Sequence, residues 1–572
     1  MKEKKEIKDS TSKSTMITQK KISDANLLNK KGNDYYGQGN YNEALGYYQK
    51  AQNLNPENWV FYANVGDAFR KLNKHDQAIQ SYKKTLKFRP QEHAINNSIG
   101  LSYALSGKYL KAAEHFIDAI KVAPKTIYYL NAGDAFKSLG KWDEVLDYYQ
   151  EAVALEPDSD EAVNTLGLAY FKDGQYEQAI EQFKKAIAIN PNKFIYQANL
   201  GDSYVRLSDW QSAIDAYQKV LELKDDDVLS ITNLGDAFRA LGKWDAAIEC
   251  YEQALALNKK AKQKNNEILT NRLGVAYSSK GEHQKALTYY QEAAHANPEN
   301  MVYQSNLGDI YRKLKNWDQA IIYYQKALDL DPKDAISLNG IGVTYFSTGD
   351  YEQAISFYHR AEAEDATNPV YILNLADSYL ALKNYEKAKE YYNKALQITP
   401  NDETIYAGLA RTLSEVGKYH KAIEKYDKAI SLKSQPKYFA SIGRIYGKLQ
   451  HFEEAIEACL KAVNLAQEND PNDQNLKKYL GLAYNDWGVY FDGLGQFSKA
   501  ILKYRKAIKY HPENPILHHN LYLALKSTWE KKVSLEKMKE AKEHLEQAVK
   551  LDPANPTYEQ ALMQLDADIA KL

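Results

Sequence analysis

An asparagine and an aspartate recur together, three residues apart, at six places along the chain. The pairs are Asn64 with Asp67, Asn131 with Asp134, Asn199 with Asp202, Asn233 with Asp236, Asn306 with Asp309, and Asn374 with Asp377. A spacing of i, i+3 puts both side chains on the same face of a helix. A carboxamide carries a donor and an acceptor, so it can pair with one peptide unit of another chain whatever side chains that chain has. We therefore take these twelve residues as the candidate peptide-binding residues.

Two structural roles for the same residues stay open. In three of the pairs an arginine follows three residues after the aspartate, which permits an ordinary ion pair within one helix. These arginines are Arg70, Arg239 and Arg312. The asparagines can likewise hydrogen-bond to a neighbouring repeat, and a soluble surface also requires polar residues.

Catalytic and metal-binding patterns are missing from the sequence. It contains no GxxxxGK[ST] loop, no HExxH and no CxxC, and its twelve histidines are scattered. His518 and His519 are adjacent, but no second pair at ligand spacing accompanies them. We therefore predict no catalytic residue, no metal site and no cofactor, and we expect that the protein is not an enzyme.

The helices that must position the asparagines are clearest in the stretch Asn306 to Pro332. Leu307, Gly308 and Tyr311 mark a first helix, and Ala320, Tyr324 and Ala327 mark a second. The second helix is expected to end before the proline, which disfavours helical geometry in the preceding residue. A mid-helix glycine costs roughly 1 kcal/mol relative to alanine, so Gly308 predicts a close approach of the partner helix.

The same glycine returns with a period of about 34 residues. It is found as Gly32, Gly66, Gly100, Gly133, Gly167, Gly201, Gly235, Gly274, Gly308 and Gly342, with alanine in its place at Ala376 and Ala410. We call these positions the glycine column. Such a period indicates a solenoid, in which each unit buries its apolar face against its neighbours.

This repeat closely resembles the tetratricopeptide repeat. Gly66, Phe69, Ala78, Tyr82 and Pro90 fill the family pattern in one unit, and the resemblance covers roughly residues 25 to 553. It implies an all-α fold, a right-handed superhelical solenoid of antiparallel helix pairs with about 15 repeats. It also implies that the first helix of each pair lines a concave groove, which binds extended peptide or helical segments of partner proteins. The expected function is a non-catalytic protein–protein interaction scaffold.

The spaced asparagines are similar to the asparagine ladder of O-linked N-acetylglucosamine transferase, whose amides grip a peptide main chain. Here the amides skip many units, and no room remains after the array for a glycosyltransferase domain. The similarity therefore implies binding without catalysis. The alternative function is a substrate-recognition or regulatory subunit of an enzyme complex.

The domain organisation expected from the pattern has three parts. Residues 1–24 are a polar, disordered leader, residues 25–553 form the repeat array, and residues 554–572 form a C-terminal capping helix that covers the exposed end. Insertions interrupt the array near residues 258–266, 467–480 and 522–535.

The composition of the chain indicates which classes of partner and which cellular location to expect. The formal net charge of −1 lacks the basic excess typical of nucleic-acid binding, so we expect no nucleic-acid partner. The chain has no run of about 20 apolar residues and no apolar core near its beginning, so we expect no membrane insertion and a cytoplasmic protein. Cys250 and Cys459 are expected to be reduced core residues.

Overall fold

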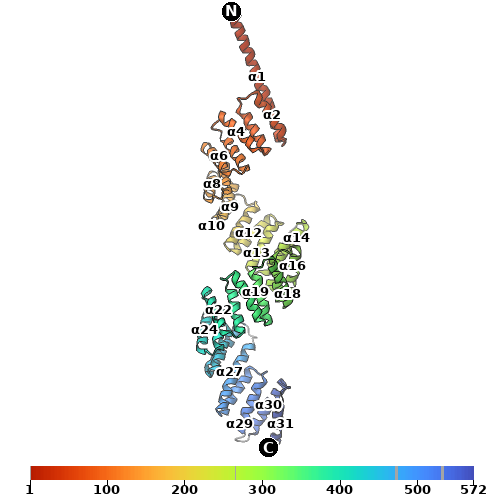
Figure 1. Cartoon of the computed structure of the whole chain (residues 1–572), viewed down its shortest axis with the longest axis vertical. Coiled ribbons are helices and arrows are strands. Elements are labelled where there is room, and N and C mark those ends of the chain that lie inside the picture. The colour runs from red at the N-terminus through yellow and green to blue at the C-terminus, as the bar shows by residue number, and fades with distance from the viewer. Residues whose placement is uncertain (1, 264–265, 470–473, 530–533, 572) are drawn as a thin grey trace. The chain divides into compact units, whose positions relative to one another are not determined.

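The computed structural model describes residues 2–263, 266–469, 474–529 and 534–571. All regular secondary structure in these ranges is helical, and the helices follow one another in antiparallel pairs joined by short turns (Figure 1). Fifteen pairs, α1 to α30, precede a single last helix, α31. This confirms the prediction of an all-α array of about 15 helix pairs. We call the odd-numbered helices first helices and the even-numbered helices second helices.

The chain divides into two compact units, residues Met1–Tyr289 and Tyr290–Leu572. The helices of the first unit are α1 Lys2–Gly37, α2 Tyr41–Leu54, α3 Trp59–Lys71, α4 His75–Phe88, α5 His93–Leu105, α6 Tyr109–Val122, α7 Thr126–Ser138, α8 Trp142–Leu155, α9 Asp160–Lys172, α10 Tyr176–Ile189, α11 Phe194–Arg206, α12 Trp210–Leu223, α13 Val228–Ala240, α14 Trp244–Lys260 and α15 Glu267–Lys280. The boundary between the units falls within α16, His283–Ala296.

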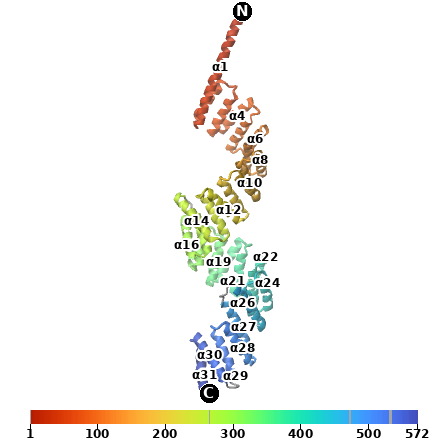
Figure 2. The same ribbon diagram turned by 180° about the vertical axis from the view of Figure 1, so that it is seen from behind.

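The second unit continues the same alternation. Its helices are α17 Met301–Lys313, α18 Trp317–Leu330, α19 Ala335–Thr348, α20 Tyr351–Glu364, α21 Pro369–Ala381, α22 Tyr385–Ile398, α23 Glu403–Glu415, α24 Tyr419–Leu432, α25 Pro436–Lys448, α26 Phe452–Asn469, α27 Gln474–Gly493, α28 Phe497–Tyr510, α29 Pro515–Trp529, α30 Leu535–Leu551 and α31 Pro556–Ala570. Within each unit consecutive pairs lie side by side (Figure 2).

Polar side chains cap the start of several helices, and a residue in the left-handed conformation follows most first helices. Asn300 caps α17 by accepting a hydrogen bond from the backbone N–H of Val302, and Asn368 caps α21 through Val370 in the same way. Gly140 has a φ of +72° in the turn between α7 and α8, a conformation that favours glycine.

The glycine column lets a second-helix aromatic ring lie flat on the first helix. A Cβ placed on Gly66 would lie 2.5 Å from Cε1 of Tyr82, and one on Gly308 would lie 2.6 Å from Cδ1 of Tyr324. Both tyrosines are fully buried. The close approach predicted from Gly308 is therefore confirmed, and the group that approaches is the tyrosine ring of the second helix.

Successive first helices also touch one another within each unit, for example α3 with α5, α5 with α7, α17 with α19 and α19 with α21. No pair of successive second helices makes comparable contact in the described part of the chain. The first helices therefore form the inner, more closely packed side of each unit.

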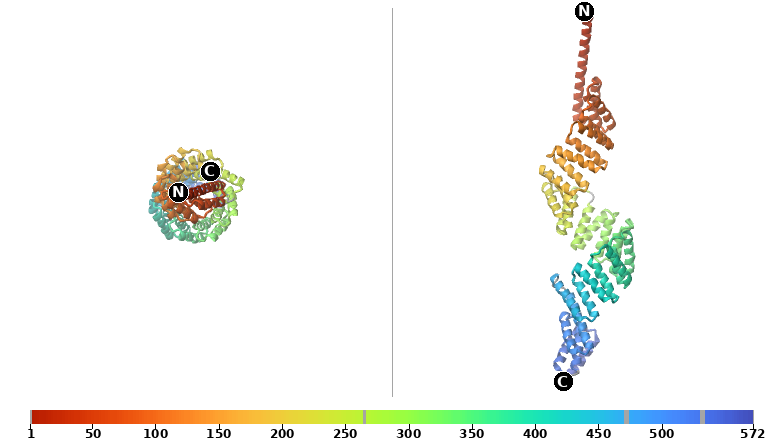
Figure 3. Two further views of the ribbon diagram at one scale, coloured as in Figure 1. Left: turned by 90° about the horizontal axis from the view of Figure 1, so that it is seen from above. Right: turned by 90° about the vertical axis from the view of Figure 1, so that its left-hand side faces the viewer.

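The ends and insertions lengthen individual helices. Residues 2–24, where the sequence predicts a disordered leader, form the beginning of α1 in the structure, which extends away from the rest of its unit (Figure 3). No glycine or proline precedes Gly32 to stop a helix there.

The other predicted segments fall at the following places. α14 runs on to Lys260, into the insertion near residues 258–266. α27 is 20 residues long, against 13 for α25, and it holds both Gly481 and Gly488. Residues 264–265, 470–473 and 530–533, which belong to the three insertions, lie outside the described residues. The predicted cap corresponds to α31, whose Tyr558 and Leu565 are buried in a cluster with α29 and α30.

Candidate functional site

The six candidate asparagines lie on six different first helices. α3, α7, α11 and α13 carry Asn64, Asn131, Asn199 and Asn233 in the first unit, and α17 and α21 carry Asn306 and Asn374 in the second. All six side chains are half-buried, as are five of the six aspartates, while Asp134 is exposed. The predicted residues thus lie at equivalent points on the inner side of each unit.

Four of the six candidate asparagines donate a hydrogen bond to an asparagine of the preceding first helix. The amide nitrogen Nδ2 of Asn64 donates to Oδ1 of Asn29 at 2.7 Å, and that of Asn131 donates to Oδ1 of Asn97 at 2.8 Å. The same bond joins Asn199 to Asn164, Asn374 to Asn339 and Asn520 to Asn485, at 2.8 to 2.9 Å. We call these pairs the amide ladder. They form the hydrogen bonds between repeats that the sequence left open as a structural role.

Sequence reasoning missed the accepting half of the ladder. Asn29, Asn97, Asn164 and Asn339 lie three residues before the column glycine, and Asn485 lies three residues before Gly488, whereas most of the donors lie two residues before a column position. The signal was the spacing of 34 to 35 residues between donor and acceptor. Asn233 departs from the pattern, because its Nδ2 donates to Oδ1 of Asp202 at 3.2 Å.

The aspartates hold the second helix of their own repeat. Oδ1 of Asp67 accepts a hydrogen bond from the hydroxyl of Tyr82 at 2.7 Å, and Oδ1 of Asp309 accepts one from Tyr324 at 2.6 Å. Equivalent bonds join Tyr149 to Asp134, Tyr217 to Asp202, Tyr251 to Asp236 and Tyr392 to Asp377. Burial, followed by the charge of Asp309, raises the pKa of Tyr324 well above its ordinary value, so the phenol stays a donor.

The ion pairs that the sequence permits also form. The guanidinium of Arg70 lies 3.3 Å from Oδ1 of Asp67, and that of Arg312 lies 3.0 Å from Oδ1 of Asp309. Arg239 lies 3.6 Å from Asp236. Each carboxylate is thus shared between a tyrosine and an arginine, which fixes its position on the inner side.

The ladder fixes the amides without using all their hydrogen-bonding capacity. One N–H of Asn131 is engaged by Asn97, and a carboxamide has a second N–H as well as an acceptor oxygen. In the described part of the chain no protein group donates to Oδ1 of Asn64, Asn131, Asn199 or Asn374. The amides are therefore oriented, and each keeps a donor and an acceptor for a ligand.

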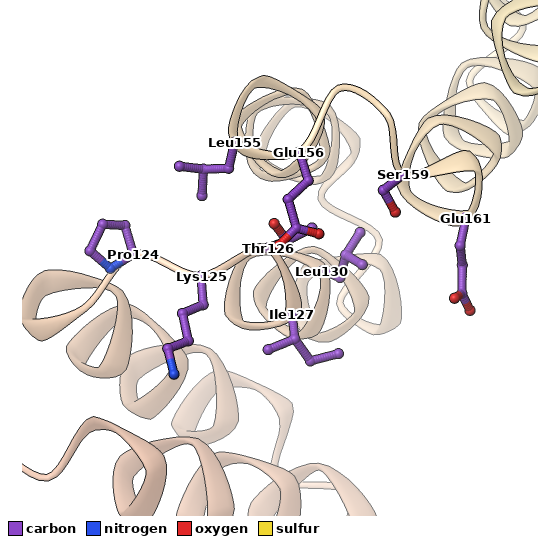
Figure 4. A pocket seen from close by; sticks show the side chains of 9 residues that line it. All are labelled: Pro124, Lys125, Thr126, Ile127, Leu130, Leu155, Glu156, Ser159 and Glu161. Carbon is purple, nitrogen blue, oxygen red and sulfur yellow. The ribbon is translucent and has the colours of Figure 1, made fainter. Parts of the chain in front are cut away.

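Three of the twelve residues line one hollow in the first unit. Asp202, Asn233 and Asp236 lie around a space of about 290 Å³ between α11 and α13, together with Trp210. A different hollow, of about 530 Å³, lies between the loop before α7 and the start of α9 and is lined by Lys125, Ile127 and Glu156 (Figure 4). None of the twelve predicted residues lines this second hollow.

The described residues contain no group of three or more histidine, cysteine or acidic side chains placed to hold a metal ion. His518 uses both ring nitrogens within the fold, Nε2 with the carbonyl of Pro512 at 2.8 Å and Nδ1 with Nδ1 of His544 at 3.0 Å. Cys250 and Cys459 are buried, and burial raises the pKa of both thiols to about 11. Along the ranges that the structure covers, no helix is both long and apolar enough to cross a membrane.

Family models described as tetratricopeptide repeats match most of the chain. The matches cover residues 29–93, 133–174, 167–208, 198–227, 227–296, 300–363, 345–413, 404–437, 436–469 and 532–555. All of these models describe repeats, and none describes a catalytic domain.

Similar curated proteins overlap with short parts of the chain. BBSome complex member BBS4 of Bos taurus is 27% identical over 135 residues, which are 24% of this chain and 26% of the relative. Hsp70-Hsp90 organizing protein 2 of Arabidopsis thaliana is 37% identical over 60 residues, 10% of each chain. The chain therefore spans about a quarter of the BBSome relative, and less of the organizing protein.

Solved structures with similar folds overlap with less than half of the chain. A tetratricopeptide repeat protein from Parabacteroides merdae is 21% identical with a TM-score of 0.38, over 45% of this chain and 99% of that one. The MamA protein is 27% identical with a TM-score of 0.28, over 29% of this chain and 92% of that one.

Proposed function

The chain belongs to the tetratricopeptide repeat family, and we propose from this premise that it is a non-catalytic scaffold that binds other proteins along its first helices. The ligand is an extended peptide or helical segment of a partner protein. The relatives include an Hsp70-Hsp90 organizing protein and a peroxisomal targeting signal receptor, whose names describe protein recognition. We further propose a cytoplasmic location, without nucleic-acid binding or membrane insertion.

The proposed binding residues are the twelve asparagines and aspartates of the first helices. The observation that supports this role is the amide ladder, because it orients four of the asparagines in advance, Asn64, Asn131, Asn199 and Asn374, and still leaves each of these four a donor and an acceptor. A preoriented group loses less conformational entropy when a ligand binds. A peptide main chain, which repeats one donor and one acceptor per residue, matches such a row of amides.

The hollow between α11 and α13 is the proposed centre of this face. It brings Asp202, Asn233 and Asp236 together, since α11 and α13 are successive first helices that both carry the Asn/Asp pair. Elsewhere in the first unit such helices alternate with helices that carry only the acceptor asparagine. A peptide that crosses α11 and α13 would meet the densest set of candidate contacts.

The second candidate function is a substrate-recognition or regulatory subunit of an enzyme complex. The ladder is compatible with it, because the same amide contacts would present a substrate to a catalytic partner. The two functions differ in what accompanies the protein. A stoichiometric catalytic partner indicates the subunit, whereas a free protein that retains diverse partners indicates the scaffold.

Affinity purification from cell extract tests the proposal. The wild-type chain and a variant with Asn131, Asn199, Asn233, Asn306 and Asn374 replaced by alanine serve as two baits, and retained proteins are identified by mass spectrometry. We expect that the wild type retains a defined set of proteins and that the variant loses most of it. An identical set on both baits, with the variant folded by circular dichroism, contradicts the assignment of these asparagines.

A further inference from the structure

The residue after the glycine column changes charge in the middle of the second unit. It is an aspartate on α17 and α21, Asp309 and Asp377, but it is Arg411 on α23 and, after Gly443 at the equivalent point of α25, Arg444. The ladder position two residues before the column changes too, to Gly408 and Ser441. From α21 to α23 and α25, the equivalent points of the inner side thus pass from amide and acid to small residues and arginine.

Lysines on α25 extend this basic region. Lys437, Arg444 and Lys448 are spaced by seven and four residues, which puts them on one face of the helix. All three are exposed, and none of them has an ion-pair partner in the described part of the chain. Arg411 is 55% exposed and lies 3.4 Å from Oδ1 of Asp377.

Two hollows connect the basic side chains. A space of about 350 Å³ is lined by Arg411, Lys437 and Arg444, and a smaller one by Arg411, Arg444 and Lys448. Asp377 and Glu415 also line these hollows, so two carboxylates accompany four cations. The local excess is positive, although the whole chain has a formal net charge of −1.

The next first helix, α27, presents apolar side chains on the other side of Arg444. Tyr479, Leu482, Val489 and Tyr490 are 36%, 38%, 49% and 40% exposed, and they line a hollow of about 630 Å³ together with Arg444 and Lys448. The guanidinium of Arg444 lies 5.6 Å from the centre of the Tyr479 ring. Arg444 therefore borders both the basic hollows and the apolar one.

We propose that α23, α25 and α27 form a second binding groove, for a partner peptide that carries acidic residues beside a large apolar side chain. Arginine pairs with carboxylates through two parallel hydrogen bonds, which would occupy Arg411 and Arg444. The apolar hollow lies in the size range of ligand pockets and would take an aromatic or branched aliphatic side chain. This groove deepens the proposed scaffold function, since it rests on peptide binding, but it uses none of the twelve residues except the neighbouring Asp377.

The lining favours a peptide over a nucleic acid. Asp377, Glu415 and Asp486 border the groove and would repel a phosphate backbone, which carries a charge at every nucleotide. An acidic peptide can place its carboxylates at the arginines alone. Tyr479 and Tyr490 then cover the apolar side chain rather than stack on bases.

Fluorescence anisotropy with the full chain tests the groove. The probes are the fluorescein-labelled peptides EEDEDFL and LFDEDEE, because the structure does not fix the peptide direction. We expect at least one of them to bind, with affinity lowered at least tenfold by Arg411→Asp with Arg444→Asp, and also by Leu482→Asn with Val489→Asn. The matched control, Lys421→Asp with Lys428→Asp, makes the same charge change at exposed positions of α24 and should leave the affinity unchanged.

Four results would overturn the groove. The first is that neither probe binds, and the second is that a folded Arg411→Asp, Arg444→Asp variant binds the probe as tightly as the wild type. The third is that the wild type binds the peptide EEDEDGS, which lacks the apolar residues, as tightly as the probe. The fourth is that a single-stranded oligonucleotide of matched charge displaces the probe completely. Self-association of the wild type that the arginine variant abolishes would also overturn it, because the occupant would then be a second copy. The variant with five asparagines replaced by alanine distinguishes this groove from the proposed binding by the asparagines. It should no longer bind the partners retained from cell extract, but it should still bind the acidic probe.

Discussion

Two neighbouring helices, α21 and α23, differ at one position that decides their surface chemistry. Both have alanine in the glycine column, Ala376 and Ala410, and both alanines are fully buried. The next residue is Asp377 on α21, which accepts a hydrogen bond from Tyr392, and Arg411 on α23. The repeat therefore keeps its packing residues and varies the residue beside them. We infer that the column fixes the fold, and that recognition depends on the residues that flank it.

The largest loss of stability is expected when the buried tyrosine of the second helix is truncated. This tyrosine is present both in the repeat with Asp377 and in the repeat with Arg411. Tyr392 and Tyr426 are buried, and truncation of a buried aromatic residue to alanine typically costs about 3–5 kcal/mol. Tyr392→Ala and Tyr426→Ala should therefore destabilise the second unit to a similar degree, as measured by denaturant unfolding. If only Tyr392→Ala lowered the stability, the view that both repeats depend on the same packing would be contradicted.

A smaller loss is expected at the column glycine itself. Gly308→Leu places a side chain against the ring of Tyr324 and should cost about 1–3 kcal/mol, although leucine is the better helix former. The matched control is Gly46→Leu in α2, where an added Cβ meets nothing within 4 Å. We expect the control to stabilise slightly. A rise of the unfolding midpoint for Gly308→Leu would remove the packing explanation of the column.

Removal of the tyrosine hydroxyl should change the stability of the two repeats by different amounts. Tyr392→Phe loses the hydrogen bond to Asp377 and should cost about 0.5–1.5 kcal/mol. Tyr426→Phe should cost less, because the hydroxyl of Tyr426 is hydrogen-bonded to the neutral side chain of Ser441, whereas that of Tyr392 is bonded to a carboxylate. Equal losses for the two phenylalanine variants would show that the carboxylate bond adds no stability.

The smallest effect concerns the pH dependence of the acidic repeats. Burial raises the pKa of Asp202 above its ordinary value of 3.8, so the folded protein holds this proton more tightly than the unfolded chain. The resulting stability is present below the unfolded pKa and is lost as pH rises through the folded pKa. The wild type should therefore lose stability relative to Asp202→Asn as pH rises from below 3.8 through the higher folded pKa of Asp202. Parallel unfolding midpoints across this range would contradict the shift.

The fold could be predicted from local signals. The glycine period, the turn before each second helix and the prolines near the second-helix ends reflect packing that every repeat must satisfy, so one stretch such as Asn306 to Pro332 predicts the others. The close contact at Gly308 followed from the cost of a mid-helix glycine. These features depend only on one repeat and its neighbour.

The bonds of the candidate site could not be predicted in the same way. Asn64 bonds to Asn29 of the preceding first helix, and the packing that brings the two side chains together cannot be read from the spacing of residues within either helix. The sequence proposes the aspartates as peptide-binding residues and permits an arginine ion pair for three of them, but it does not reveal the bond to the tyrosine of the facing helix, fifteen residues later. The charge change at Arg411 and Arg444 is visible in the sequence, but its meaning required the hollows that join α23 to α27.

The central claim is that the first-helix asparagines hold a partner peptide, and calorimetric titration tests it most directly. A partner segment found by affinity purification is titrated into the wild type and into the variant with Asn131, Asn199, Asn233, Asn306 and Asn374 replaced by alanine. A hydrogen bond contributes about 0.5–1.5 kcal/mol net, and about 1.4 kcal/mol is tenfold in affinity. We therefore predict a loss of a hundredfold or more, with circular dichroism showing that the variant is folded. Unchanged affinity in a folded variant would contradict the claim and leave these asparagines as bonds between repeats.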